Sequence, residues 1–260
     1  MDGRKSALLV LSLALGCTGC ITTHEKQTTI RGMDEPPPPS MAPAKEEAKK
    51  PAPPAVLRSL AAMRESGADE HKDRPEVQAR LRDDARRAYQ EALKAEPDNL
   101  EALRGLARVY TSMGEYDRAN ETYKKALAKY PRDVTLWYDL GMMHDRRKDW
   151  PEGARCFYKA LEIDPENQRC LKAMGFTLAR AGQLDQSLFY LTRAMGSAVA
   201  AHTNVALMLI HLAEQEPAEQ ASRLELARQH LRVALQENPN YERARDLLAS
   251  LEGTAPDARQ

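Results

Sequence analysis

The sequence predicts an all-α chain in which helical hairpins stack one on the next, behind an N-terminal leader and a proline-rich tether. The second half of the chain is dominated by Ala, Leu, Glu, Arg and Lys, a helix-forming mixture. No alternating strand pattern is visible. The endings "EALKAEPDN", "KALAKYPRD" and "KALEIDPEN" place Pro97, Pro131 and Pro165 at intervals of 34 residues. A helix ending that recurs at a fixed period is typical of a repeat architecture.

Residues 1–16 predict a lipoprotein signal peptide. Arg4 and Lys5 precede the apolar stretch "ALLVLSLAL", which is too short to span a bilayer and suits a secretory signal. The following "LALGC" resembles the lipobox of bacterial lipoproteins, and this resemblance implies a diacylated Cys17 as the mature N-terminus. Cys20 is the alternative acceptor. A cleaved signal without a lipid, and a C-x-x-C redox or metal pair, are the other interpretations.

Residues 17–54 predict a disordered tether. This stretch combines proline clusters with charges and almost no large apolar side chains, so it cannot bury enough surface to offset the entropy lost on ordering. Proline favours the extended polyproline II conformation, which makes a semi-rigid spacer. Residues 55–74 predict a short helix and a polar loop, and Asp73 with Pro75 marks the start of the next helix.

A pattern of small and large apolar residues recurs in both helices of each unit. Residues three and four apart share one helical face, where small residues let two helices approach and large ones fill the groove alongside. The second helices carry Ala85, Tyr89 and Ala92; Ala119, Tyr123 and Ala126; Gly153, Phe157 and Ala160; Ser187, Leu191 and Ala194; and Ala227, Leu231 and Ala234. The first helices carry Leu103, Leu106, Ala107 and Tyr110; Trp137, Leu140, Gly141 and His144; Leu171, Met174, Gly175 and Leu178; and Val205, Met208, Leu209 and Leu212.

Each hairpin can bury its apolar face only against its neighbours, so the hairpins must stack. Gly114 and Gly182 suit the left-handed turn between paired helices, and each proline prevents the second helix from continuing. The predicted stack covers residues 75–251, with units at about 75–99, 100–133, 134–167, 168–201 and 202–241, a capping helix at 241–251 and a flexible tail at 252–260.

The 34-residue period and "WYDLG", from Trp137 to Gly141, resemble the tetratricopeptide-repeat family over about Ala85 to Leu251. The resemblance implies a right-handed α-solenoid whose first helices line a concave groove, with Trp137 in the core. The chain departs from the family pattern in three places. The first unit lacks a first helix in register, the fourth has Val199 in place of proline, and the fifth has about six extra residues in its turn.

The sequence contains no recognisable catalytic constellation or cofactor motif, which favours a non-enzymatic protein without a metal site. The six histidines never pair at the four-residue spacing of a helical zinc site. Basic and acidic residues number 38 each, so the basic excess of nucleic-acid-binding proteins is absent. His144 is expected to pack at a helix interface. Cys156 and Cys170 are expected to be two independent thiols, with a disulfide as the alternative.

The family resemblance also implies which side chains line the groove: Arg104, Arg108, Tyr138, Met142, Arg146, Arg169, Lys172, Phe176, Arg180 and Ile210. Guanidinium groups pair with carboxylates while aromatic and thioether side chains grip apolar ones, so an acidic, hydrophobic peptide is the expected ligand. Solvated arginines beside ordinary core packing are the alternative. The carboxylate clamp of some family members is not expected, because Asp139 replaces its asparagine.

These features predict a lipid-anchored scaffold that binds another protein in the bacterial cell envelope. Thr18, rather than an aspartate, follows Cys17, which by the lipoprotein resemblance favours the periplasmic face of the outer membrane. Lipoproteins of similar organisation assist the assembly of secretion systems or pili, or act as adaptors for envelope enzymes. A self-assembling structural protein and a non-catalytic subunit of an envelope enzyme complex are the alternatives. The sequence leaves the partner, the pathway and the oligomeric state open.

Overall fold

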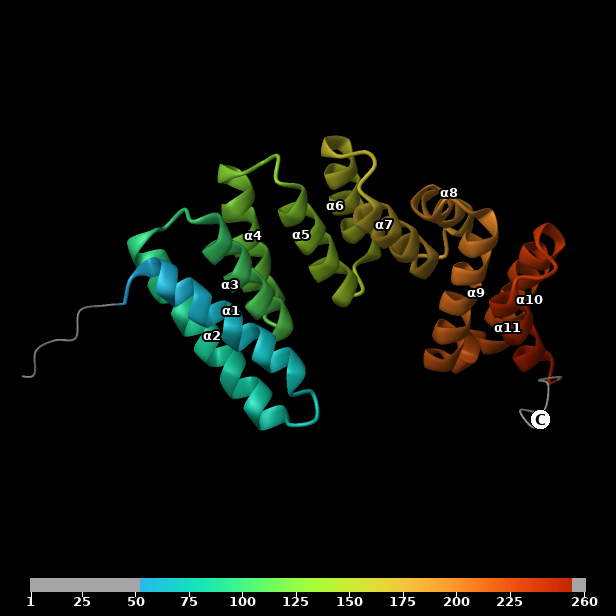
Figure 1. The fold of residues 1–260 in the computed structure, drawn as a ribbon, viewed down its shortest axis with the longest axis horizontal. Helices are drawn as coiled ribbons and strands as arrows, with labels where there is room; N and C mark the ends of the chain where they lie inside the picture. Colours follow the sequence, from blue (N-terminus) through green and yellow to red (C-terminus); the bar gives the residue numbers. More distant parts are fainter. Residues whose placement is uncertain (1–51, 254–260) are drawn as a thin grey trace, which may run out of the picture. The chain divides into compact units, whose positions relative to one another are not determined.

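The computed structural model describes residues 52–253, which form eleven α-helices and one 3₁₀ turn with no β-strand among them (Figure 1). The leader, most of the tether, both lipidation candidates (Cys17 and Cys20) and the tail beyond residue 253 lie outside the described residues. The helices are α1 (Pro54–Glu70), α2 (Pro75–Ala95), α3 (Leu100–Ser112), α4 (Tyr116–Lys129), α5 (Val134–Arg146), α6 (Trp150–Ile163), α7 (Gln168–Arg180), α8 (Leu184–Met195), α9 (Ala198–Gln215), α10 (Gln220–Glu237) and α11 (Glu242–Glu252). None of these helices is both long enough and apolar enough to cross a membrane.

The helices pair in chain order and the pairs follow one another (Figure 1). α1 packs on α2, α3 on α4, α5 on α6, α7 on α8 and α9 on α10, and α11 then packs on α10. The first helices of successive hairpins also touch, from α1 through α3, α5 and α7 to α9. This order of contacts confirms the predicted all-α solenoid of stacked hairpins.

The repeated sequence ending forms a joint that stops one helix and caps the next. The side chains of Asn99, Asp133 and Asn167 each accept a hydrogen bond from the backbone N–H three residues further on, at the start of the next first helix. A proline two residues earlier, such as Pro97 before Asn99, cannot continue the preceding helix. Ser197 caps α9 in the same way, although no proline precedes it. Each such cap contributes about 1 kcal/mol to stability.

Two glycines of the first helices allow close approach of the paired second helices. A Cβ atom on Gly141 would lie 2.6 Å from Phe157 Cε1, and one on Gly175 would lie 2.6 Å from Leu191 Cγ. The large side chains of Phe157 and Leu191 are fully buried at these contacts. The predicted pairing of small and large residues is therefore confirmed in the third and fourth hairpins.

The turns inside the hairpins have left-handed backbone at one position. Gly114 and Gly182 have φ of 77° there, as their sequence context predicts. Lys148 stands at the same place in the third hairpin and has φ of 62°. A side chain makes this conformation sterically unfavourable, so Lys148 is a local source of strain.

The first hairpin differs from the sequence prediction. We expected residues 55–74 to form a short helix and loop, leaving the first unit without a first helix in register. The helix and the loop are present, as α1 and residues 71–74, but α1 is 17 residues long and packs against both α2 and α3, so the first unit does have a first helix. α2 has 21 residues, whereas α4 and α6 have 14 each, so the start of α2 displaces α1 toward the N-terminus. The buried small residues of α1 are Ala61 and Ala68, and their positions do not align with those of the small residues in the later first helices.

The fifth hairpin has longer helices rather than a longer turn. α9 and α10 have 18 residues each, against 13 in α7 and 12 in α8. Only Glu216 and the 3₁₀ turn Pro217–Glu219 connect α9 to α10. The prediction that the extra residues enlarge the turn is therefore wrong. Leu209, which replaces the usual small residue, is nonetheless buried between the helices.

Trp137 lies at the edge of the core and not inside it, contrary to the family-based expectation. Its side chain is only partly buried and packs against two apolar clusters. The indole Nε1–H donates to the carbonyl oxygen of Pro131 at 2.9 Å. An indole N–H needs an acceptor, and the backbone of the joint supplies one at the surface. Leu136 beside it is the fully buried residue of this turn of α5.

Candidate functional site

A cavity of about 880 Å³ is lined mainly by the first helices α1, α3, α5 and α7, with further residues from α2, α4 and the loop after α1, and we call it the groove. It is lined by Ala62, Glu65, Ser66, Asp69, Lys72, Gln78, Arg82, Arg104, Arg108, Thr111, Ser112, Tyr123, Tyr138, Asp139, Met142, Met143, Arg146 and Arg169. Six of the side chains expected in a groove are therefore brought together here: Arg104, Arg108, Tyr138, Met142, Arg146 and Arg169.

The other four expected side chains lie outside the groove lining. Lys172 is exposed on α7. Phe176 and Ile210 are partly buried and pack against the apolar cluster of the C-terminal helices. Arg180 is bound to Asp145 of the neighbouring first helix. The groove thus belongs to the N-terminal part of the surface that the family resemblance implies.

Arg108 is held by a carboxylate from the first helix. Its Nε and Nη2 donate to Glu65 Oε1 and Oε2 at 2.8 and 2.7 Å, a bidentate pair between α3 and α1. The hydroxyl of Tyr89 donates to the same carboxylate at 3.2 Å. Hydrogen bonding to Glu65 raises the pKa of Arg108, and burial together with the charge of Glu65 raises the pKa of Tyr89. Arg108 is therefore fixed as a cation in an internal contact.

Two further ion pairs continue this connection along the first helices. Arg104 Nε donates to Asp139 Oδ2 at 2.7 Å, which joins α3 to α5. Asp145 accepts hydrogen bonds at 2.7 Å from Arg180 Nη1 and from the hydroxyl of Thr177, which joins α5 to α7. We call the three pairs Glu65–Arg108, Arg104–Asp139 and Asp145–Arg180 the first-helix ladder.

The ladder changes the interpretation of the arginines. The sequence suggested that Arg104 and Arg108 face a ligand as unpaired cations. In the fold, each has a carboxylate partner whose side chain is mostly buried, so its charge is largely compensated. Charge-assisted, partly buried pairs of this kind hold neighbouring helices in register. The main role of Arg104 and Arg108 is therefore to stabilise the stack of helices.

Four other cations in the groove form no ion pair with a described residue: Lys72, Arg82, Arg146 and Arg169. The guanidinium of Arg169 lies over the ring of Tyr138, 4.7 Å from its centroid. The Nε of Arg82 is buried without a hydrogen-bond partner among the described residues. Asp69 is the remaining lining carboxylate outside the ladder. The uncompensated charge of the groove is therefore positive.

Apolar side chains lie beside these cations on α5. Tyr138 and Met142 are partly exposed in the groove, and the ring of Tyr138 lies 5.8 Å from that of buried Phe157. Contact with the core limits the movement of this ring. The groove thus combines hydrogen-bond donors for an anion with a firm apolar surface.

Two family models match the chain. The model of the Cilia and flagella-associated protein 70 middle TPR-like domain matches residues 103–234, which are 132 of the 260 residues, and a tetratricopeptide-repeat model matches residues 76–112. The chain belongs to the tetratricopeptide-repeat family. Domains of this family bind protein or peptide partners and generally serve as non-catalytic scaffolds.

Curated relatives share segments of the repeat domain. Photosystem I assembly protein Ycf3 of Synechococcus sp. (strain CC9311) is 39% identical over 62 residues, which are 23% of this chain and 36% of that protein. General transcriptional corepressor ssn6 of Schizosaccharomyces pombe is 30% identical over 83 residues, which are 31% of this chain and 8% of that protein. The chain thus spans about a third or less of the length of these relatives.

Solved structures share the tetratricopeptide-repeat fold. A crystal structure of MamA protein matches with a TM-score of 0.51 and 17% identity, over 73% of this chain and 93% of that one. PilF of Pseudomonas aeruginosa matches with a TM-score of 0.50 and 20% identity, over 77% of this chain and 86% of that one. At these identities the similarity is one of fold.

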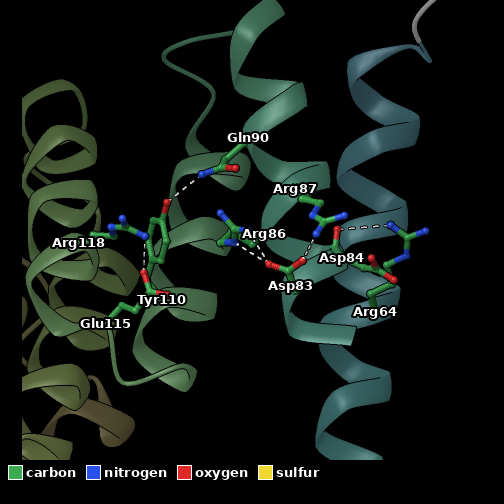
Figure 2. Close-up of polar contacts among 9 residues, drawn as sticks. All are labelled: Arg64, Asp83, Asp84, Arg86, Arg87, Gln90, Tyr110, Glu115 and Arg118. Carbon is green, nitrogen blue, oxygen red and sulfur yellow. Dashed lines mark hydrogen bonds and ion pairs between the residues drawn. The ribbon is translucent and has the colours of Figure 1, made fainter. Parts of the chain in front are cut away.

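Figure 2 shows a second set of polar contacts in the repeat domain, among residues of α1, α2, α3 and the start of α4. Arg64 of α1 donates to the backbone carbonyl of Asp84 at 3.3 Å, and Asp83 accepts from Arg86 on the same helix. Gln90 Nε2 donates to the hydroxyl of Tyr110 at 2.9 Å, which joins α2 to α3. These contacts hold α1 on α2 and α2 on α3.

The repeat domain gives little support for redox or nucleophilic chemistry. Cys156 and Cys170 are buried free thiols, and burial raises the pKa of Cys156 to about 12 and that of Cys170 to about 11. His144 is largely buried with Nδ1 3.2 Å from Asp149 Oδ2, as expected for a packed histidine. Within residues 52–253, no three His, Cys, Asp or Glu side chains are grouped so as to enclose a metal ion.

Sequence reasoning missed Glu65 and Arg82. It also missed that Asp139 pairs with Arg104 and that Asp145 pairs with Arg180. Glu65 and Arg82 belong to the first hairpin, whose register the repeat pattern did not reveal. The aspartates were visible, but their partners lie 35 residues away, close to the repeat period. Opposite charges one period apart on facing helices were the signal that could have revealed the ladder.

Proposed function

We propose that this chain is a protein-binding scaffold whose groove holds an acidic, partly apolar segment of a partner. The observation that carries the proposal is the set of uncompensated cations beside Tyr138 and Met142. Arg146 and Arg169 supply donors for carboxylates, and the two apolar side chains supply a surface for a hydrophobic residue. The ladder arginines Arg104 and Arg108 form part of the wall of this site.

Arg169 is well placed for such a role. Its contact with the ring of Tyr138 restricts the side chain, so less side-chain entropy is lost when a carboxylate binds. Its N–H groups have no ion-pair partner among the described residues.

An acidic probe peptide tests the proposal. We would compare a labelled peptide of Asp, Glu, Leu and Phe with a version carrying Lys in place of each acid, by fluorescence anisotropy. The acidic peptide is expected to bind, and more weakly as salt rises, because the cations are partly solvent-exposed. The double variant Arg146→Glu/Arg169→Glu should lose binding without a large change in melting temperature.

The matched control carries the same charge change outside the groove. Lys124→Glu/Arg132→Glu replaces two exposed cations of the second hairpin and its following joint. This variant should bind the acidic peptide like the unaltered chain. Equal binding of the acidic and basic peptides, or equal loss in both double variants, would contradict the proposal.

We further propose that the scaffold is anchored in a bacterial envelope membrane through Cys17, on the periplasmic face, where it assists the assembly of a larger complex. The leader motif supports the anchor, and the likeness to a photosystem I assembly protein supports an assembly role. Cys17→Ser should move the protein from the membrane to the soluble fraction, and Cys20→Ser should not. Membrane retention of the Cys17→Ser variant would argue against Cys17 as the anchor.

Self-association is the second candidate function, and an apolar face on α1 favours it. Val56, Leu60 and Met63 are 54%, 37% and 72% exposed and lie on one side of the helix that begins the stack. A second copy could cover this face, as a preceding hairpin would. Light scattering at increasing protein concentration should detect a dimer that the Leu60→Lys/Met63→Lys variant lacks. A monomer at all concentrations would exclude this function.

A further inference from the structure

The fifth hairpin contains two histidines in direct contact. His202 of α9 and His230 of α10 have their Nδ1 atoms 2.9 Å apart, with ring centroids 5.2 Å apart and ring planes inclined by 38°. The two residues lie 28 positions apart in the sequence, so only the packing of α9 on α10 brings them together. Both side chains are partly exposed, which leaves them accessible to a solute.

We propose that His202 and His230 form a two-imidazole chelate for a divalent transition-metal ion, with Cu²⁺ and Ni²⁺ as the preferred ions. In the metal-free chain, one Nδ1–H donates to the other Nδ1 lone pair. When that proton moves to Nε2 of its own ring, both Nδ1 lone pairs become available. A metal ion then replaces the hydrogen bond, and no proton needs to leave the protein.

The distance between the nitrogens indicates the class of metal. With metal–nitrogen bonds of 2.0–2.1 Å, donors 2.9 Å apart subtend about 90° at the ion. This angle is that of neighbouring ligands in square-planar or octahedral geometry, which Cu²⁺ and Ni²⁺ adopt with imidazole. A small rotation of each ring about its terminal torsion, which is soft, turns both lone pairs toward one point. Mg²⁺ and Ca²⁺ prefer oxygen donors and should not bind.

The surroundings favour neutral imidazoles as ligands. Burial lowers the pKa of both side chains, and the neighbouring His202 lowers that of His230 further. The nearby charges that act on the pair are both acidic, Glu237 on His202 and Asp185 on His230. Neutral imidazoles bind metals at neutral pH, and negative charge nearby stabilises a bound dication.

The site has two protein ligands and is otherwise open. No third His, Cys, Asp or Glu among residues 52–253 is grouped with the pair closely enough to enclose an ion. Water or a ligand from another molecule therefore completes the coordination. Binding of one ion to each chain, reversible by a chelator, is the behaviour that such an open chelate predicts.

Titration of the untagged full chain with Ni²⁺ and with Cu²⁺ tests the proposal. Isothermal titration calorimetry should show one saturable site for each chain, and saturation should raise the melting temperature because the ion links α9 to α10. His202→Gln and His230→Gln should each weaken binding by at least about tenfold. Mg²⁺ should produce neither heat nor a shift in melting temperature.

His211→Gln is the matched control. His211 lies on α9, as His202 does, but it is exposed and its ring contacts Gln215 and Glu214 and no second histidine among the described residues. This variant should bind metal like the unaltered chain. Circular dichroism identifies variants that fail to fold, and the double variant His202→Gln/His230→Gln gives the background from the remaining histidines. Equal affinity of the unaltered chain and this double variant would overturn the proposal.

Discussion

From α1 to α7, neighbouring first helices are joined by the ladder, whereas α7 and α9 meet with no ion pair described between them. The joints differ as well. Residues 164–167 separate α6 from α7, but only Gly196 and Ser197 separate α8 from α9. The C-terminal helices α8–α11 share one apolar cluster around Leu191 and Leu231.

This difference shows that one repeat pattern accommodates two ways of joining hairpins. In the N-terminal part, charged side chains fix the spacing of the first helices and leave a groove between them. In the C-terminal part, a short joint and apolar packing bring the helices together, and Phe176 and Ile210 pack partly buried there. A ligand site of the proposed kind is therefore expected in the N-terminal part.

Truncation of a core side chain should have the largest effect on stability, and the effect should be similar in the two parts of the stack. Phe157→Ala in the third hairpin should lower the free energy of unfolding by about 3–5 kcal/mol, and Leu231→Ala in the fifth by about 2–5 kcal/mol, because both side chains are fully buried. Trp137→Ala should have a smaller effect than Phe157→Ala, since Trp137 is partly exposed. Chemical denaturation measures all three, and a larger loss for Trp137→Ala would contradict its place at the edge.

Loss of a ladder carboxylate should have the next largest effect. Asp145→Ala should destabilise the fold by about 2–3 kcal/mol, because it removes charge-assisted hydrogen bonds and leaves buried Thr177 without its acceptor. The control is Asp117→Ala, which removes an exposed carboxylate 3.4 Å from Arg147 and should change stability by less than about 0.5 kcal/mol. Equal losses in urea denaturation would mean that the ladder is no stronger than a surface pair.

Helix capping should be similar in the two parts. Asn167→Ala at α7 and Ser197→Ala at α9 should each lower stability by about 1 kcal/mol, because each removes the acceptor for a first-turn backbone N–H. Thermal unfolding followed by circular dichroism is the measurement. If Ser197→Ala had no effect, the cap would not be needed, and the short joint with the apolar packing would suffice to fix the start of α9. The two parts would then differ in capping as well.

The smallest effect should be a gain in stability. Lys148→Gly should stabilise the fold by about 0.5–1 kcal/mol, because glycine adopts the left-handed φ of 62° without the steric penalty of a side chain. Lys148→Ala keeps a Cβ and serves as the control, with little or no gain expected. A loss of stability in Lys148→Gly would show that the lysine side chain makes a contact that outweighs the strain.

Much of the fold could be predicted from the sequence because its signals are local. Prolines, caps such as Asn99 and glycines such as Gly114 determine where helices end, and they recur in register. The first hairpin was not recognised as a complete unit, because α2 starts earlier than the other second helices and places α1 further toward the N-terminus. Trp137 was misplaced because its position in the family pattern does not show that its indole N–H is directed to Pro131.

The candidate site was predicted only in outline. The family pattern identified which first-helix residues face the groove, and six of them line it. It did not distinguish paired arginines from free ones, because pairing depends on the distance between helices. Glu65 could not be predicted as a groove residue for a further reason: the position of α1 does not follow the 34-residue repeat. The pair His202–His230 likewise depends on how α9 packs on α10, which residue spacing along one helix cannot reveal.

A double-mutant cycle on Arg104 and Asp139 tests most directly whether the groove arginines hold the stack together. The free energies of unfolding of Arg104→Gln, Asp139→Asn and the double variant would be compared with that of the unaltered chain. The ladder predicts a coupling energy of about 1 kcal/mol or more, because the pair is short and Asp139 is mostly buried. Additive effects, with no coupling, would mean that Arg104 is a free groove cation and that the ladder does not stabilise the fold.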